Sequence, residues 1–105
     1  MNKLVRDFIP RIIENRGEKA FVYVAKRSEY KRRLIDKLLE EVFEFQENPC
    51  IEELADILEV IDALHQAFDF SKKRVCEVQK CKRLERGGFA NRYVLKKVEK
   101  EANLP

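Results

Sequence analysis

The chain has 105 residues, 45% of them hydrophobic and 39% charged, with only three glycines and three prolines. This balance excludes collagen-like, low-complexity and mostly disordered proteins, and the length predicts a single domain over residues 1–105. No apolar run approaches the roughly 20 residues of a membrane span, and residues 1–7 lack the apolar core of a secretory signal. The three cysteines are an odd number without metal-ligand spacing, which suits a reducing compartment. We therefore expect a cytoplasmic protein with no membrane partner.

The net charge of +3 is the sum of three blocks of opposite sign. Residues 1–37 carry +6, residues 38–71 carry −10 without one lysine or arginine, and residues 72–105 carry +7. One interpretation is mutual neutralisation, with an acidic helix pair lying against basic helices. The other is a division of tasks, in which the acids bind a hard cation and the bases bind phosphates.

Apolar residues recur at helical spacing from the beginning of the chain. They predict a first helix over about 8–16, after an extended lead-in. Asp7 is a candidate N-cap, Pro10 would lie in the first turn, and Gly17 is a natural stop. The following segment 21–25 (Phe-Val-Tyr-Val-Ala) is rich in β-forming residues and predicts one strand or an extended crossing.

Two long helices are expected next, at about 28–47 and 51–68. Ser28 can cap the first of them, and Asn48-Pro49 ends it because proline disfavours helical geometry in the residue before it. Ser71 can cap a last helix that continues to about Arg86 and stops at Gly87-Gly88.

In the remaining tail, apolar and polar residues alternate weakly, so the tail is expected to be either a fraying helix or a strand. A strand over 92–98 could pair with 21–25 in a short β-ribbon. The predicted fold class is therefore all-α, with an antiparallel helical hairpin as its core. Because two long helices bury little surface by themselves, we expect a homodimer that completes a four-helix bundle.

Two pairs of acids lie at matched distances from the turn of this hairpin. Glu44 is three residues before the turn and Glu53 three after it, whereas Glu41 and Asp56 are each six away. Residues three apart on a helix are about 60° apart and share a face, so antiparallel pairing brings all four carboxylates to one patch. A solvated acidic face remains the alternative, but oxygen ligands without a basic neighbour in the block favour a Mg²⁺ site, with Mn²⁺ as a second option.

The acidic pattern E-E-x-x-E at 40–44, followed by E-x-x-D at 53–56, resembles the signature of MazG-like, all-α nucleoside triphosphate pyrophosphohydrolases. N-K-L-V-R-D-F-I-P at 2–10, E-L-A-D-I-L-E-V at 53–60 and R-G-G-F at 86–89 resemble a small single-domain branch of that superfamily, described as house-cleaning or phosphoribosyl-ATP pyrophosphohydrolase-like. The resemblance covers about residues 2–89. Phe8 departs from it, since a lysine or another polar residue is expected there.

The resemblance implies Mg²⁺-dependent hydrolysis of a nucleoside triphosphate to a monophosphate and pyrophosphate. It implies metal ligation by Glu41, Glu44, Glu53 and Asp56, and a catalytic role for Glu40, Glu41 and Glu44, with Glu40 as a general base or a support to the ligands. It also implies a nucleotide substrate and points to the same homodimer. The physical logic agrees, because a divalent cation neutralises the charge that develops on leaving pyrophosphate.

Basic residues flank the acidic block on both sides. The candidates for contact with the β- and γ-phosphates are Lys3, Arg6, Lys82, Arg83 and Arg86. The single histidine, His65, is expected to be buried and hydrogen-bonded rather than catalytic. Phe89 and Tyr93 are open candidates for stacking on a nucleobase.

Two other classes of function remain open. Clusters of lysine and arginine at 26–33 and 72–83 favour a small helical nucleic-acid-binding module, although the −10 block would repel a phosphate backbone. A helical oligomerisation domain without catalysis is the third hypothesis. Millimolar Mg²⁺ should stabilise a true carboxylate site and leave a solvated acidic face unchanged beyond ionic strength.

Overall fold

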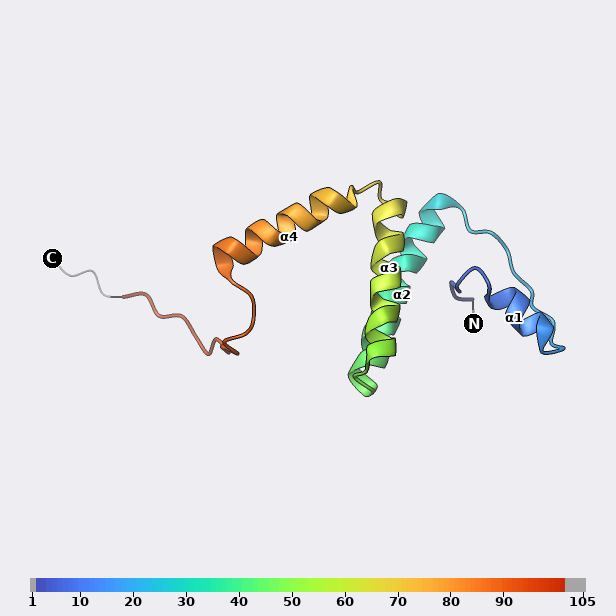
Figure 1. Ribbon diagram of the computed structural model, residues 1–105, viewed down its shortest axis with the longest axis horizontal. Helices are drawn as coiled ribbons and strands as arrows, with labels where there is room; N and C mark the ends of the chain where they lie inside the picture. Colours follow the sequence, from blue (N-terminus) through green and yellow to red (C-terminus); the bar gives the residue numbers. More distant parts are fainter. Residues whose placement is uncertain (1, 102–105) are drawn as a thin grey trace.

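The computed structural model describes residues 2–101, and within them every regular element is a helix. Figure 1 shows four helices in chain order: α1 (Ile9–Asn15), α2 (Arg27–Glu47), α3 (Ile51–Ala67) and α4 (Lys72–Arg86). The all-α prediction is thus confirmed. Of these described helices, none combines the length and the apolar character that crossing a bilayer requires.

The core lies in the antiparallel hairpin of α2 and α3, the helices with the extensive mutual contact. Leu34 of α2 packs against Val60 and Ala67 of α3, and all three are buried. The turn is short because Asn48 and Pro49 stop α2, and the Asn48 amide donates to the carbonyl of Glu44 at 3.0 Å. A short turn forces the two helices to lie side by side, as the sequence predicts.

The two ends of the chain extend from this hairpin in different directions (Figure 1). The segment before α1 crosses the hairpin, where Leu4 packs against the core cluster. On the other side, α4 begins with the predicted cap, since the Ser71 hydroxyl accepts from the Arg74 amide at 3.1 Å. It ends at Gly87, whose φ of +84° suits glycine and whose amide donates to the Arg83 carbonyl at 2.8 Å.

The β-ribbon that the sequence allowed is absent from the part of the chain that the structure describes. Residues 21–25 and 92–98 form neither strand nor helix. Figure 1 places them on opposite sides of the hairpin, in a molecule 78 Å long, so neither segment offers the other a hydrogen-bonding edge. A strand needs such an edge, and β-forming composition alone does not supply it.

Two predicted helix caps are also wrong. Ser28 lies inside α2, whose N-cap is Lys26, because the Lys26 carbonyl already accepts from the Tyr30 amide at 2.8 Å. Asp7 precedes α1, whose N-cap is Phe8 and has no side-chain hydrogen bond. In both cases the backbone starts the helix at a residue whose side chain cannot cap it.

One copy of the chain exposes far more surface than a compact protein of its size. Its accessible surface is 10220 Å², whereas a compact monomer of this mass exposes about 6,200 Å². Its radius of gyration is 20.1 Å, compared with about 13 Å expected for this length. The fold therefore leaves much apolar surface unburied on α2, α3 and α4.

Since Leu34 is only 3% exposed at the centre of the core, Leu34→Ala should lower the free energy of unfolding by about 2–5 kcal/mol. Urea unfolding followed by circular dichroism measures this loss. Leu84→Ala is the matched control, because Leu84 is 77% exposed on α4 and the same truncation there should cost no more than about 0.5 kcal/mol. Equal losses in the two variants would contradict the placement of the core.

Candidate metal centre

Four carboxylates meet where α2 and α3 face each other near the turn. Glu41 and Glu44 come from α2, and Glu53 and Asp56 come from α3. One oxygen from each of the four lies within 4.8 Å of the oxygens of the others. The convergence predicted from the distances to the hairpin turn is thus confirmed, whereas the role of these groups as metal ligands stays a prediction.

Glu41 is the most buried member of this carboxylate cluster, and only 7% of its surface is exposed. Its Oε2 is buried and has no hydrogen-bond partner among the described residues, and the same holds for Oε2 of Glu53. A buried carboxylate oxygen without a partner costs free energy. A carboxylate of this kind beside three further carboxylates favours the binding of a cation.

The electrostatics of the cluster favour an added positive charge. The pKa of Glu41 is raised from 4.5 to about 7, mainly by burial and also by the neighbouring Glu44, while Lys37 acts in the opposite direction. Burial also raises the pKa of Glu53, to which the negative charges of Glu44 and Asp56 contribute. Both shifts express the cost of holding like charges together in a partly desolvated place.

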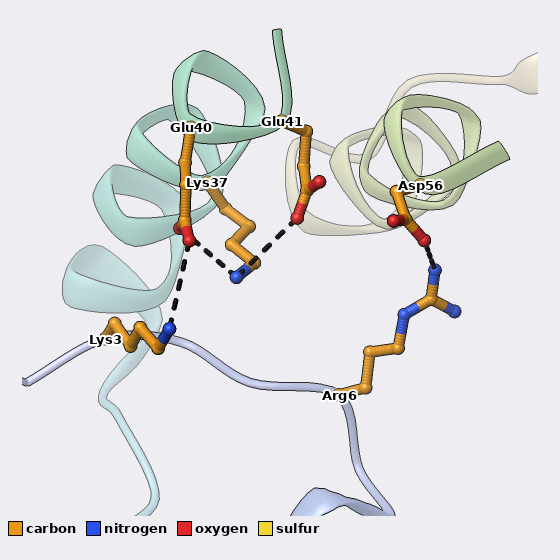
Figure 2. Close-up of polar contacts among 6 residues, drawn as sticks. All are labelled: Lys3, Arg6, Lys37, Glu40, Glu41 and Asp56. Carbon is orange, nitrogen blue, oxygen red and sulfur yellow. Dashed lines mark hydrogen bonds and ion pairs between the residues drawn. The ribbon is translucent and has the colours of Figure 1, made fainter. Parts of the chain in front are cut away.

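Three basic residues approach the cluster from outside the acidic block (Figure 2). Lys37 lies one turn before the acids on α2 and reaches Glu40 at 3.2 Å and Glu41 at 3.7 Å. From the N-terminal segment, which is residues 2–8 before α1, Arg6 pairs with Asp56 at 2.6 Å and Lys3 approaches Glu40 at 3.9 Å. Lys37 is not among the site residues predicted from the sequence, although its i, i+3 and i, i+4 spacing to Glu40 and Glu41 is a signal for such pairs.

The remaining candidate residues divide into those near the cluster and those apart from it. Glu40 lies at its edge, paired with two lysines. Lys3 and Arg6 are paired with carboxylates, and their predicted contact with phosphates stays a prediction. Lys82, Arg83 and Arg86 lie on α4, which leads away from the hairpin, so one copy of the chain does not bring them to the acids (Figure 1).

The other side chains considered from the sequence lie outside the site. Phe89 is 98% exposed and Tyr93 is 89% exposed, so neither contributes to a formed base-binding surface in one copy. His65 is half-buried, but its Nδ1 has no hydrogen-bond partner among the described residues, which corrects the expected hydrogen bond.

The donor set fits a hard divalent cation. All four ligands would be carboxylate oxygens, which suit Mg²⁺ or Mn²⁺ and disfavour softer metals. Lys37 and Arg6 neutralise part of the negative charge and leave Glu44 and Glu53 without an ion pair among the described residues. The arrangement can therefore hold a cation and expose it to an anionic ligand.

Comparisons with known proteins add nothing to this geometry, since no protein-family model, curated protein or solved structure matches the chain.

The raised pKa of Glu41 predicts that the metal-free protein loses stability as the pH rises. The folded state holds this proton more tightly than the unfolded chain, so the contribution is full below pH 4.5 and is lost as the pH passes about 7. The loss amounts to about 3 kcal/mol. Urea unfolding in EDTA should show this decline, Glu41→Gln should reduce it, and Mg²⁺ should restore the stability of the wild type at pH 8.

Glu59→Gln is the control for this test, since Glu59 is exposed on α3 and outside the cluster. It should keep the pH dependence of the wild type. If Glu41→Gln and Glu59→Gln behave alike, the assignment of the pH dependence to the buried carboxylate is wrong.

Proposed function

We propose that the protein is a Mg²⁺-dependent nucleoside triphosphate pyrophosphohydrolase, which cleaves the bond between the α- and β-phosphates. The observation that carries this proposal is the meeting of four carboxylates from two helices, one of which belongs to Glu41, whose buried Oε2 has no hydrogen-bond partner among the described residues. The sequence resemblance to MazG-like pyrophosphohydrolases supplies the reaction. The geometry supports it independently, because the acids that form the motif are the acids that converge.

The residues divide the work according to their positions. Glu41, Glu44, Glu53 and Asp56 would hold the cation, and a bound Mg²⁺ would supply neutralisation of the triphosphate and of the leaving pyrophosphate. Glu40 lies at the edge of the cluster and outside the ligand set, so it is our candidate to accept a proton from the attacking water. The water oxygen bonds to the α-phosphorus, and the bond from that phosphorus to the bridging oxygen breaks.

Positive charge beside the cluster supports binding of the phosphates. A small hollow between the N-terminal segment and α2 is lined in part by Lys3, Arg33 and Lys37. Lysine and arginine side chains there can pair with phosphate oxygens once a cation neutralises the acids. The carboxylates and the bases thus lie on one side of the hairpin, as a cation and its triphosphate require.

Pyrophosphate release from a panel of canonical and modified nucleoside triphosphates, with and without Mg²⁺, tests this proposal. We expect Mg²⁺-dependent release together with a nucleoside monophosphate, and a fall of at least about 10- to 100-fold in Glu44→Gln because a ligand to the cation is lost. Glu47→Gln, one turn further along α2 and outside the cluster, is the control and should retain activity. No release from any nucleotide, with no effect of Mg²⁺ on melting, would refute the enzyme.

We also propose that two copies of the chain pair through one face of the hairpin. On α2, the exposed residues Val42, Ile35 and Leu39 are rotated about the helix axis by about +80° to +140° from the buried Leu34. On α3, the exposed Leu54 and Leu58 are rotated by about +120° to +160° from the buried Val60. In antiparallel neighbours, offsets of the same sign lead to the same side of the pair. The hairpin therefore carries one continuous, uncovered apolar face.

The charged groups lie on the opposite side of the hairpin. Glu44 and Asp56 have offsets of about −80° and −40° from the same reference residues. Packing two apolar faces together would give the four-helix bundle predicted from the sequence and leave both carboxylate clusters accessible. The accessible surface of 10220 Å², about 4,000 Å² above that of a compact monomer, supports such a partner.

Light scattering coupled to gel filtration should give a mass of twice 12.5 kDa for the wild-type chain. Leu39→Glu places a charge at the centre of the apolar face, so it should shift the protein toward the monomer. Leu84→Glu places the same charge on the exposed surface of α4 and should leave the mass unchanged. A monomeric wild type would remove the dimer and leave the enzyme proposal intact.

A second candidate function rests on α4. All of its residues are exposed, and seven of them are basic: Lys72, Lys73, Arg74, Lys80, Lys82, Arg83 and Arg86. An exposed basic helix is a feature of nucleic-acid binding. Salt-sensitive binding of RNA or DNA, together with absence of pyrophosphate release, would favour this function over the enzyme.

A further inference from the structure

The N-terminal segment is fixed across the charged side of the hairpin by two contacts. Leu4 packs against the core cluster of Leu34, Val60 and Ala67. Arg33 of α2 donates from Nη1 to the carbonyl of Asn2 at 2.9 Å. These contacts lie on either side of Lys3, so they hold the backbone of this segment beside the carboxylate cluster (Figure 2).

Two basic side chains of this segment meet different partners. Arg6 donates from Nη2 to Oδ1 of Asp56 at 2.6 Å, and Asp56 is one of the four converging carboxylates. Lys3 approaches Glu40 at 3.9 Å, and Glu40 is outside that set. Arg6 therefore touches the cluster itself, whereas Lys3 adds a similar positive charge without contacting any of its four members.

The contact between Arg6 and Asp56 is of the kind that another cation can replace. Its two side chains are 56% and 38% exposed, and ion pairs open to solvent contribute little free energy. A divalent cation in the cluster would meet four carboxylates, including that of Glu41, which is nine-tenths buried and whose Oε2 has no hydrogen-bond partner among the described residues. The cation and Arg6 would therefore compete for the carboxylate of Asp56.

We propose that Arg6 exchanges partners: it pairs with Asp56 when the cluster holds no cation, and it pairs with a phosphate group of the anion that the cation brings. A guanidinium presents the same planar pair of donors to a carboxylate and to a phosphate. Arg6 would thus couple cation binding to anion binding. This inference rests on the metal centre of the proposed function.

Opposite effects on two affinities test the exchange. Arg6→Ala removes the guanidinium that competes with the cation for Asp56. The variant should therefore bind Mn²⁺ alone about two- to fivefold more tightly than the wild type, which corresponds to the free energy of an exposed ion pair. The same variant should bind inorganic tripolyphosphate in the presence of Mn²⁺ at least about fivefold more weakly. Lys3→Ala removes an equal charge from the same segment and should strengthen Mn²⁺ binding less, and Arg6→Lys should lie between the wild type and Arg6→Ala.

A spectroscopic measurement separates the exchange from a general effect of charge. In protein with ¹⁵N-labelled arginine, Mg²⁺ should shift the guanidinium signal of Arg6 and speed its hydrogen exchange. Asp56→Asn should have the same effect without metal. Arg27, which pairs with Asp69 at 2.5 Å on another part of the hairpin, is the internal control and should not respond.

The outcomes distinguish this inference from the proposed function. If Mn²⁺ binds but Arg6→Ala behaves like Lys3→Ala and the Arg6 signal ignores Mg²⁺, the exchange is overturned and the metal centre stands. If neither the wild type nor any variant binds Mn²⁺, the metal centre is overturned and the exchange with it.

Discussion

Everything in this molecule depends on the contact between α2 and α3, where an apolar seam and a set of acids share one interface. Leu34, Val60 and Ala67 bury together along it, and Glu41 is buried in the same interface nearer the turn. Apolar burial favours the contact, whereas the desolvated and mutually repelling carboxylates oppose it. The apolar part of the seam thus holds the acids in positions that they would not adopt by themselves.

The charges outside the hairpin respond to that constraint. Lys37 reduces the repulsion from within α2, and Arg6 does so from the N-terminal segment. Neither of them reaches Glu44 or the buried Oε2 of Glu53, so the neutralisation is incomplete. Because the neutralisation is incomplete, a cation that bound in the cluster would reduce the remaining repulsion among the carboxylates. This incomplete neutralisation also explains why residues that looked like phosphate ligands in the sequence lie against carboxylates in the structure.

A hairpin of two helices has two open sides, and here they differ in chemistry. Val42, Leu39 and Leu58 belong to an apolar side, and the carboxylates and their basic neighbours belong to the other. With this separation, the proposed pairing of two copies and the proposed binding of a cation would use different surfaces of the hairpin. In one copy, α1 and α4 extend away from the hairpin (Figure 1), and the side chains of the apolar side remain exposed.

The sequence by itself determined the four helices and the convergence of the acids. Helical periodicity, Pro49 and the equal spacing of Glu44 and Glu53 from the turn are local features, and local geometry fixes their consequences. Only the tertiary structure decided the burial of Glu41, the pairing of Arg6 with Asp56 and the absence of a ribbon between 21–25 and 92–98. These depend on which distant segments lie side by side, and residue spacing carries no information about that.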